Sequence, residues 1–252
     1  MTPSVRVVVN ADDLGISEHV NAEIFRLIRA GRVTSATLVA NGAAVEDAAA
    51  RLHEFPDASF GVHLNITEFA PLTSPAGLGP LLKPDGTFSG GAHGIAFTSQ
   101  LRQAVRAEWT AQIARLRSLG VDVSHIDSHN HAHTIRGLFG TLKAVQRATG
   151  IRRVRLTKNL YTAADRPGAW LLLQKSLWNA GLRHYIRTRT TAAFTSFWTL
   201  HTTASADVPP ARSIEVMVHP GHPGFADENA ALEQEWWRRF RYGVEFVSYR
   251  QI

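Results

Sequence analysis

The chain has 252 residues, of which 44% are hydrophobic and 19% are charged, and it contains no cysteine. The apolar fraction excludes a wholly disordered chain, and the lack of cysteine excludes disulfide scaffolds, thiolate metal sites and thiol nucleophiles. The formal charge is +6, and no apolar run reaches the roughly 18–20 residues that a membrane helix needs, so we expect a soluble protein without a membrane span.

The N-terminus lacks the basic, apolar and small-residue regions of a secretory signal, which predicts a cytoplasmic protein. The positive charge is concentrated between Arg147 and Arg189, where ten basic residues accompany one acid, Asp165. Such a segment can bind an anionic partner, but a solvated basic surface is commoner. Because the chain carries no known DNA- or RNA-binding motif, we expect no nucleic-acid partner.

Short apolar runs alternate with amphipathic stretches along the chain. We expect strands at residues 5–9, 34–39, 60–67, 121–127, 153–156, 214–218 and 244–247. We expect helices at residues 20–28, 45–52, 101–116, 138–145 and 227–240. About seven strands separated by helices predict an α/β fold with a mostly parallel sheet, in a single domain over residues 1–252. An irregular barrel and an open doubly wound sheet both fit this pattern.

Two segments depart from the alternation. Residues 70–97 contain four prolines and predict a long surface loop, a feature that is often functional. Residues 159–213 are rich in aromatic residues with partly helical spacing, which we interpret as a helical insertion over one end of the domain. We expect Trp170 and Trp198 to pack in the core. For residues 169–189 the alternative to core packing is an amphipathic helix on a membrane surface.

Polar side chains follow or line four of the predicted strands. Asp12 and Asp13 come after the first apolar run, and their alternative role is a turn in which Asp13 caps the next helix. His63 shares one face of its strand with Asn65 and Thr67. A third cluster, from His125 to His133, holds four of the 12 histidines within nine residues and predicts a metal site, because imidazole is a common ligand of divalent transition metals.

A fourth candidate is His219, which ends a strand before Pro220 and could protonate a leaving group. The carboxyl ends of parallel strands meet on one face. The first three of these segments could therefore assemble one Asp and two His around a divalent ion with open positions, while a second Asp remains free as a base. This is the arrangement of a catalytic metal site rather than a structural one.

These motifs, in this order, resemble the YdjC-like carbohydrate deacetylase family, which includes chitooligosaccharide deacetylases and hopanoid-biosynthesis-associated members. The resemblance is carried by the segments 9–15, 31–35, 61–67, 125–133 and 215–220. It implies a single-domain irregular (β/α) barrel of about seven strands, related to polysaccharide deacetylases. It also implies the removal of an acetyl group from a small N-acetylated sugar, by an enzyme acting on a linear amide.

The resemblance further implies a role for individual residues. Asp13, His63 and His129 would hold the divalent metal, with Mg or Zn as the candidate ion, Asp12 would be the general base and His219 the general acid. His222 could share the acid role, and we interpret the other members of the third cluster, His125, Asp127, His131 and His133, as residues that orient the ligands.

Other functions remain compatible with the residues. A metal phosphoesterase could use the same Asp and His clusters, with the basic segment 147–189 holding phosphate. A non-catalytic metal-dependent binding module is a further alternative. The sequence does not name the sugar, and a homo-oligomer is possible. Trp170 and Trp198 could stack on sugar faces, but we expect them to pack in the core rather than to do so.

Overall fold

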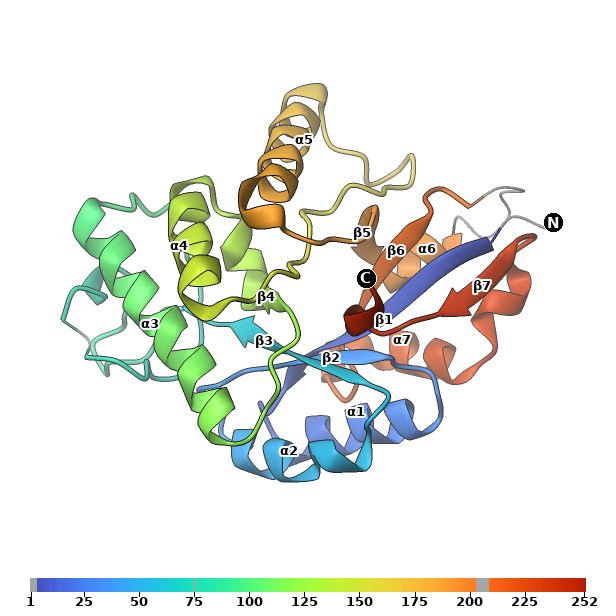
Figure 1. Ribbon diagram of the computed structural model, residues 1–252, viewed down its shortest axis with the longest axis horizontal. Helices are drawn as coiled ribbons and strands as arrows, with labels where there is room; N and C mark the ends of the chain where they lie inside the picture. Colours follow the sequence, from blue (N-terminus) through green and yellow to red (C-terminus); the bar gives the residue numbers. More distant parts are fainter. Residues whose placement is uncertain (1–3, 75, 203–208) are drawn as a thin grey trace.

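Seven parallel strands form the centre of the computed structural model, which describes residues 4–74, 76–202 and 209–252 (Figure 1). The strands are Ser4–Leu14 (β1), Ser35–Leu38 (β2), Ser59–Leu64 (β3), Ile126–Ser128 (β4), Ala193–Ser196 (β5), Ser213–Val218 (β6) and Gly243–Phe246 (β7). Their order across the sheet is β4-β3-β2-β1-β6-β5, and β7 pairs with β1. Each strand points its carboxyl end toward the same face of the molecule, because every pairing between these strands is parallel.

The central strand is β1, which pairs with three neighbours along its length. Its first residues pair with β7, its middle with β6 and its last residues with β2. The side chains of Val5, Val7, Val8 and Val9 are at most 1% exposed, as expected for a parallel strand that is covered on both faces. The strand continues through the two aspartates to Leu14, so the predicted strand at 5–9 was too short.

The sheet curls, and a short segment lies between its two edge strands. Arg155 donates its backbone N–H to the carbonyl of Ile126 in β4 (3.0 Å), and Val154 donates to the carbonyl of Arg189 just before β5 (3.1 Å). These contacts are isolated bridges rather than a strand, so the strand predicted at 153–156 is not formed and β5 completes the set of seven. The result is an irregular, incompletely closed (β/α) barrel in a single domain, which confirms the predicted fold class.

Helices connect the strands and cover the outside of the barrel. They are Glu18–Arg29 (α1), Val45–Arg51 (α2), Ser99–Ser118 (α3), Phe139–Thr149 (α4), Ala169–His184 (α5), Phe197–Thr202 (α6) and Ala226–Glu233 (α7). Ser17 begins α1 by accepting the N–H of Val20 on its hydroxyl (3.2 Å), and Gly150 ends α4 at a positive φ of 76°, which glycine adopts without strain. The helix predicted at 227–240 is split, because a 3-10 turn at Trp236–Arg239 buries Trp236 against the rings of Phe197 and Phe246.

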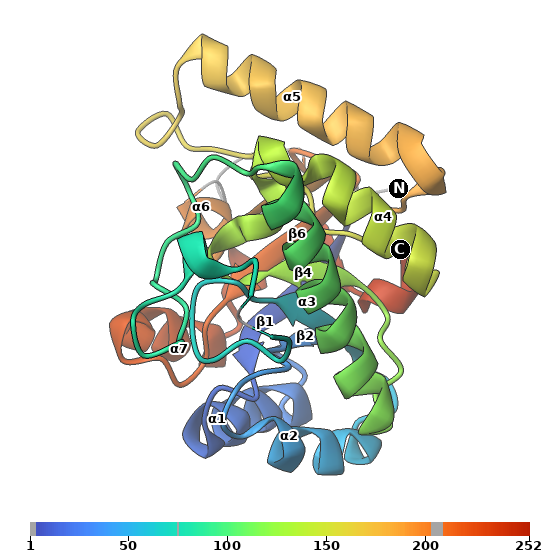
Figure 2. The same ribbon diagram turned by 90° about the vertical axis from the view of Figure 1, so that its left-hand side faces the viewer.

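The segment 159–213 contains α5, β5 and α6, and its residues 203–208 lie outside the described part of the chain. Helix α5 lies at the periphery in both views of the ribbon (Figures 1 and 2). It packs through Trp178, whose ring meets Phe139 of α4 edge to face. Trp170 is 70% exposed and Trp198 is 41% exposed, so the prediction that they pack in the core is wrong. Among the described helices, none is both long and apolar enough to cross a bilayer.

Candidate active site

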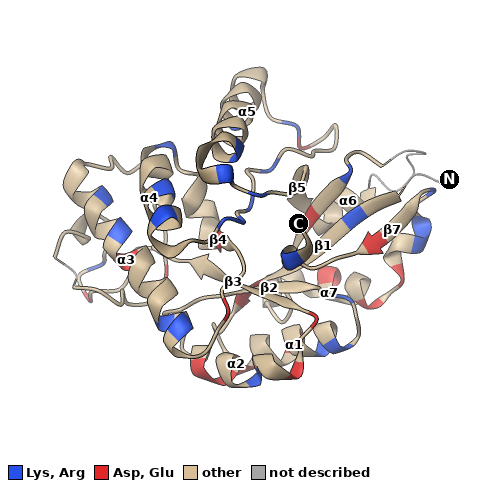
Figure 3. Cartoon of the chain, in the orientation of Figure 1, with Lys and Arg blue, Asp and Glu red and all other residues tan. Residues whose placement is uncertain are grey.

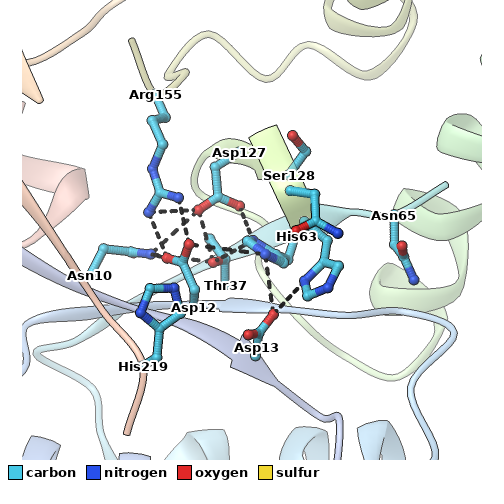
Figure 4. Close-up of polar contacts among 12 residues, drawn as sticks. Asn10, Asp12, Asp13, Thr37, His63, Asn65, Asp127, Ser128, Arg155 and His219 are labelled. Carbon is cyan, nitrogen blue, oxygen red and sulfur yellow. Dashed lines mark hydrogen bonds and ion pairs between the residues drawn. The ribbon is translucent and has the colours of Figure 1, made fainter. Parts of the chain in front are cut away.

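The carboxyl ends of four strands converge on a cavity of about 400 Å³. Its walls include Asp12 and Asp13 at the end of β1, His63 in β3, His129 directly after β4 and His219 directly after β6. The five side chains that the resemblance assigns as metal ligands, base and acid therefore lie around one cavity. Figure 4 shows the polar contacts that connect most of them.

An irregularity in β1 turns both aspartates toward the same histidine. Consecutive side chains of a regular strand point to opposite faces, but the pairing of β1 with β2 shifts register between Ala11 and Leu14, and Asp13 has a positive φ of 70°. As a result, Asp12 Oδ2 lies 4.0 Å and Asp13 Oδ1 lies 3.3 Å from His63 Nε2. Asp13 does not cap the following helix, because Ser17 does so.

His63 is fixed in orientation by the groups on its other ring nitrogen. Its Nδ1 lies 2.7 Å from Asp127 Oδ1, and Thr37 donates its hydroxyl to the other oxygen of Asp127 (2.9 Å). Burial lowers the pKa of His63, but the carboxylates of Asp127 and Asp12 outweigh burial and hold it well above its ordinary value. The carboxylate of Asp127 therefore aims Nε2 at the pair of aspartates, as the carboxylate partners of metal-binding histidines do.

His129 approaches Asp13 from the turn that follows β4. Its Nδ1 lies 2.8 Å from Asp13 Oδ1, and its Nε2 lies 3.3 Å from Glu68 Oε1. The chain bends sharply here, because the next residues Asn130 and His131 both have positive φ. One atom each of Asp13, His63 and His129 lie within 4.8 Å of one another, which is a spacing that could hold a metal ion.

The charges around Asp13 differ from those around Asp12. Burial raises the pKa of Asp13, but hydrogen bonds from His129 and His63 outweigh it and hold the pKa well below its ordinary value. Within the described residues, Asp13 has only these imidazoles as ion-pair partners and no lysine or arginine. A second group, Asp12, His63 and Asp127, is also close enough to hold a metal. Arg155 already supplies the cation there, so the Asp13 group fits a divalent ion better.

Arg155 is a residue of the site that the sequence analysis missed. Its guanidinium is fully buried and donates two hydrogen bonds of 2.6 Å to the two oxygens of Asp12. It also lies 2.9 Å from Asp127 and 2.7 Å from Glu215. Burial raises the pKa of Asp12, but Arg155 outweighs it, so the net pKa lies below its ordinary value. An arginine inside a predicted buried strand was the available signal, because a charge there needs a buried partner.

The third carboxylate around Arg155 is that of Glu215. Burial raises the pKa of Glu215 to about 7, although Arg155 opposes this. Glu215 accepts one hydrogen bond from Arg155 Nε and another from the hydroxyl of Tyr249. The ring of Tyr249 stacks on His125, with centroids 3.8 Å apart. Glu215 therefore connects the guanidinium of Arg155 to Tyr249 and, through the stacked ring of Tyr249, to His125.

The remaining histidines of the third cluster have separate partners. His125 places Nε2 3.0 Å from Asn10, which in turn donates to Asp12. His133 lies with Nδ1 2.5 Å from Ser128 and Nε2 3.2 Å from the carbonyl of Arg155. His131 lines the cavity, and its buried Nδ1 has no hydrogen-bond partner among the described residues. Burial lowers the pKa of the His131 imidazole to about 3.

His219 lines the same cavity and lies beside Asp12 (Figure 4). Its ring stacks on Phe225, with centroids 4.1 Å apart, and its Nδ1 lies 3.7 Å from Glu228 Oε1. Burial lowers the pKa of His219, but Glu228 and Asp12 outweigh it and raise the pKa above its ordinary value. His222 is exposed, accepts the N–H of Gly224 and lies outside the cavity walls.

The loop at 70–97 contributes one wall of the cavity through residues 90–93. The N–H of Gly90 donates to the carbonyl of Thr67 (2.8 Å), and His93 Nε2 lies 3.1 Å from the carbonyl of Asn130. Buried Glu108 holds the start of the loop by accepting the N–H of Thr73 (2.9 Å). Residues 90–93 of the loop are therefore attached to segments that carry site residues, and the start of the loop is attached to α3.

Comparison with known proteins gives related sequences and a related fold. Proteins named carbohydrate deacetylase are 37% identical over 162 residues in Mus musculus and 34% identical over 146 residues in Halalkalibacterium halodurans. These alignments cover 61% and 55% of this chain and 51% and 59% of the relatives, so the matched part spans about half the length of these relatives.

A solved structure from Enterococcus faecalis, described as a candidate cellobiose-phosphate cleavage protein, superimposes with a TM-score of 0.77 over 98% of both chains at 21% identity. At this identity the likeness concerns the fold alone. The family model described as YdjC-like protein matches residues 6–241. The match extends over nearly the whole chain, and this chain belongs to the YdjC-like family.

Proposed function

We propose that the chain is a metal-dependent hydrolase that removes the acetyl group from an N-acetylated sugar. The observation that carries the proposal is the Asp13, His63 and His129 group, with a second carboxylate, Asp12, beside it in the same cavity. The relatives named carbohydrate deacetylase support the class of substrate. Chitooligosaccharides are the first substrates to test.

Asp13, His63 and His129 are the residues that would hold the ion. Two imidazole nitrogens and one carboxylate oxygen suit Zn better than Mg, and three protein ligands leave positions for water and substrate. Bound there, a divalent ion would polarise the acetyl carbonyl and lower the pKa of a neighbouring water.

Asp12 is the proposed base. Its two hydrogen bonds from Arg155 hold the carboxylate in place and keep it ionised at neutral pH, so it is always ready to accept a proton. The same bonds make Asp12 a weak base, because they stabilise the charged form. A weak base of this kind suits the removal of a proton only from a water that is already acidified.

His219 is the proposed acid. Its raised pKa, due mainly to Glu228 after the opposing effect of burial, increases the fraction of protonated imidazole near neutral pH. In the reaction, the water oxygen bonds to the acetyl carbon and the C–N bond breaks. Asp12 accepts one proton from the water and His219 gives one to the amine. The acetic acid that leaves keeps the second water proton until it ionises to acetate, and proton exchange with solvent returns Asp12 and His219 to their starting states.

The test is acetate release from N-acetylglucosamine oligomers, together with the metal content of each variant. We expect Asp12→Asn to retain metal and to lose activity by about 10²–10⁴-fold, as for loss of a general base. His129→Ala should lose metal. His219→Ala should lose activity by a similar factor, whereas the exposed His222→Ala is its matched control and should not. Wild-type turnover by Asp12→Asn would refute its role, and release of phosphate rather than acetate from phosphorylated sugars would favour a phosphoesterase.

A further inference from the structure

Arginines gather at the end of the barrel opposite the catalytic cavity. A second cavity, of about 520 Å³, is lined by Arg117, Arg152, Arg153, Arg189 and Arg250. It includes residues that precede β4, such as Ser124, whereas the catalytic residues follow their strands. Figure 3 shows basic positions along the segment between α4 and β5 and at the C-terminus.

This arginine cavity has little negative charge of its own. Asp122 is the one carboxylate side chain among its described lining residues, and it is already paired with Arg250 at 2.9 Å. Arg117 donates to the carbonyl of Thr149, and Arg153 donates to the carbonyl of Arg250 and, at 3.2 Å, to a main-chain oxygen of Ile252, the last residue. The carbonyl of Thr149 orients the guanidinium of Arg117 without neutralising it.

Two arginines of the cavity are without partners. Arg152 and Arg189 are both exposed, and in the described part of the chain their guanidinium groups make no hydrogen bond or ion pair. Burial, together with the charges of Arg189 and Arg250, lowers the pKa of Arg153. Repulsion among the positive charges of Arg153, Arg189 and Arg250 costs stability, and an anion that binds between them would relieve it.

A third cavity, of about 400 Å³, adjoins the arginine cavity and shares Arg189 with it. Arg183 and Arg212 also line it. Thr191, which is 1% exposed, lines this cavity too, and its buried hydroxyl has no hydrogen-bond partner among the described residues. A buried hydroxyl without a partner is uncommon and indicates a missing ligand or water.

We propose that the two cavities together bind a small ligand with at least two phosphate groups. One phosphate lies among Arg152, Arg153 and Arg189, and the next lies toward Arg183 and Arg212. Guanidinium groups bind phosphate oxygens in pairs of parallel hydrogen bonds, and Arg189 is placed to contact both groups. Two adjoining cavities that share one arginine suit a compact ligand rather than a duplex or a flat membrane surface. The site does not depend on the deacetylase proposal.

The test uses inorganic pyrophosphate and ADP as probes on protein freed of metal with EDTA. Removing metal matters because pyrophosphate chelates divalent ions and would otherwise act through the catalytic site. At a hundredfold excess over Kd we expect the melting temperature to rise by about 5–10 °C, and sodium chloride at the same ionic strength should not raise it. Tighter binding of ADP than of pyrophosphate would identify the ligand as a nucleotide, and equal binding would identify the phosphates as sufficient.

The variant for this test is Arg152→Gln with Arg189→Gln, measured by isothermal titration. We expect its affinity for pyrophosphate to fall at least about tenfold, because each lost guanidinium removes charged hydrogen bonds. The matched control is Arg106→Gln with Arg166→Gln, which removes the same charge from exposed positions and should bind as the wild type does. Three results would overturn the proposal: no binding of either probe, unchanged affinity in the Arg152/Arg189 variant, or binding of anionic vesicles through these arginines without binding of pyrophosphate.

Discussion

Replacing Glu215 by glutamine should make the stability of the protein rise relative to wild type as the pH increases. Glu215 is fully buried, and it accepts hydrogen bonds from Arg155 and Tyr249. Glutamine has nearly the same shape, keeps an oxygen for Arg155 and carries no charge. The variant therefore resembles the protonated form of Glu215 and removes one titration without removing the side chain.

The direction follows from the raised pKa of Glu215, which burial moves from its ordinary 4.5 to about 7. A carboxyl whose pKa is raised by folding favours the folded state while it is protonated in both states, below about pH 4.5. This contribution is lost as the pH rises toward 7, because the unfolded chain ionises first. Above pH 7 the wild type bears the full cost of a buried charge, and the glutamine variant does not.

The magnitude follows from the same two values. The interval from 4.5 to about 7, at about 1.4 kcal/mol for each pH unit, gives about 3 kcal/mol. In a chain of this length, about 2–4 °C in melting temperature corresponds to 1 kcal/mol. Between pH 4.5 and pH 7.5, the melting temperature of Glu215→Gln should thus gain about 6–12 °C relative to that of the wild type.

The measurement is urea denaturation and thermal melting of both proteins at four pH values from 4.5 to 7.5. All other titrating groups are common to the two proteins, so their effects cancel in the difference. Glu245→Gln is the matched control, because Glu245 is an exposed residue of β7, and its difference from wild type should stay within about 0.5 kcal/mol. A difference for Glu215→Gln that stays constant with pH, or that falls as the pH rises, would refute the reasoning.

Three further predictions concern neighbouring residues. Arg155→Met should lower the free energy of unfolding by about 3–5 kcal/mol in urea denaturation, because it leaves buried carboxylates without a cation; a loss below 1 kcal/mol would contradict this. Gly61→Ala should lower the free energy of unfolding by about 1–3 kcal/mol, because a Cβ there would lie 2.6 Å from the ring of His125. A melting temperature equal to that of the wild type would contradict this close packing. Zinc at a hundredfold excess over Kd should stabilise EDTA-treated protein by about 2.7 kcal/mol, and Asp13→Asn should abolish this gain; an equal gain in the variant would place the ion elsewhere.

Residues that follow apolar runs were predictable as neighbours in space. Asp12, Asp13, His63 and His129 each stand at or just beyond the end of a parallel strand, and parallel topology brings such positions to one face. The prediction needed no knowledge of side-chain contacts. It depended on the period and order of the elements, which local sequence determines strongly.

Other features were not predictable because they depend on contacts between distant residues. The pairing of Arg155 with Asp12 joins positions 143 residues apart. Strand β5 is only four residues long, too short to show a period, and it was hidden in a segment interpreted as helical. Helix α5 has an apolar composition, but composition does not show whether another element packs against the apolar face of a helix. Trp170 of this helix is exposed.

The position of β1 at the centre of the sheet has a consequence for how the protein is made. Residues 6–11 pair with 213–218, and residues 4–7 pair with 243–246. A ribosome releases β1 long before it releases these two partners, so the nascent chain must carry a valine-rich segment with unpaired edges through most of its synthesis. Pairings of such long sequence separation form slowly, and exposed strand edges promote aggregation. The aspartate pair at the end of β1 can reach its final geometry only after synthesis has passed β6.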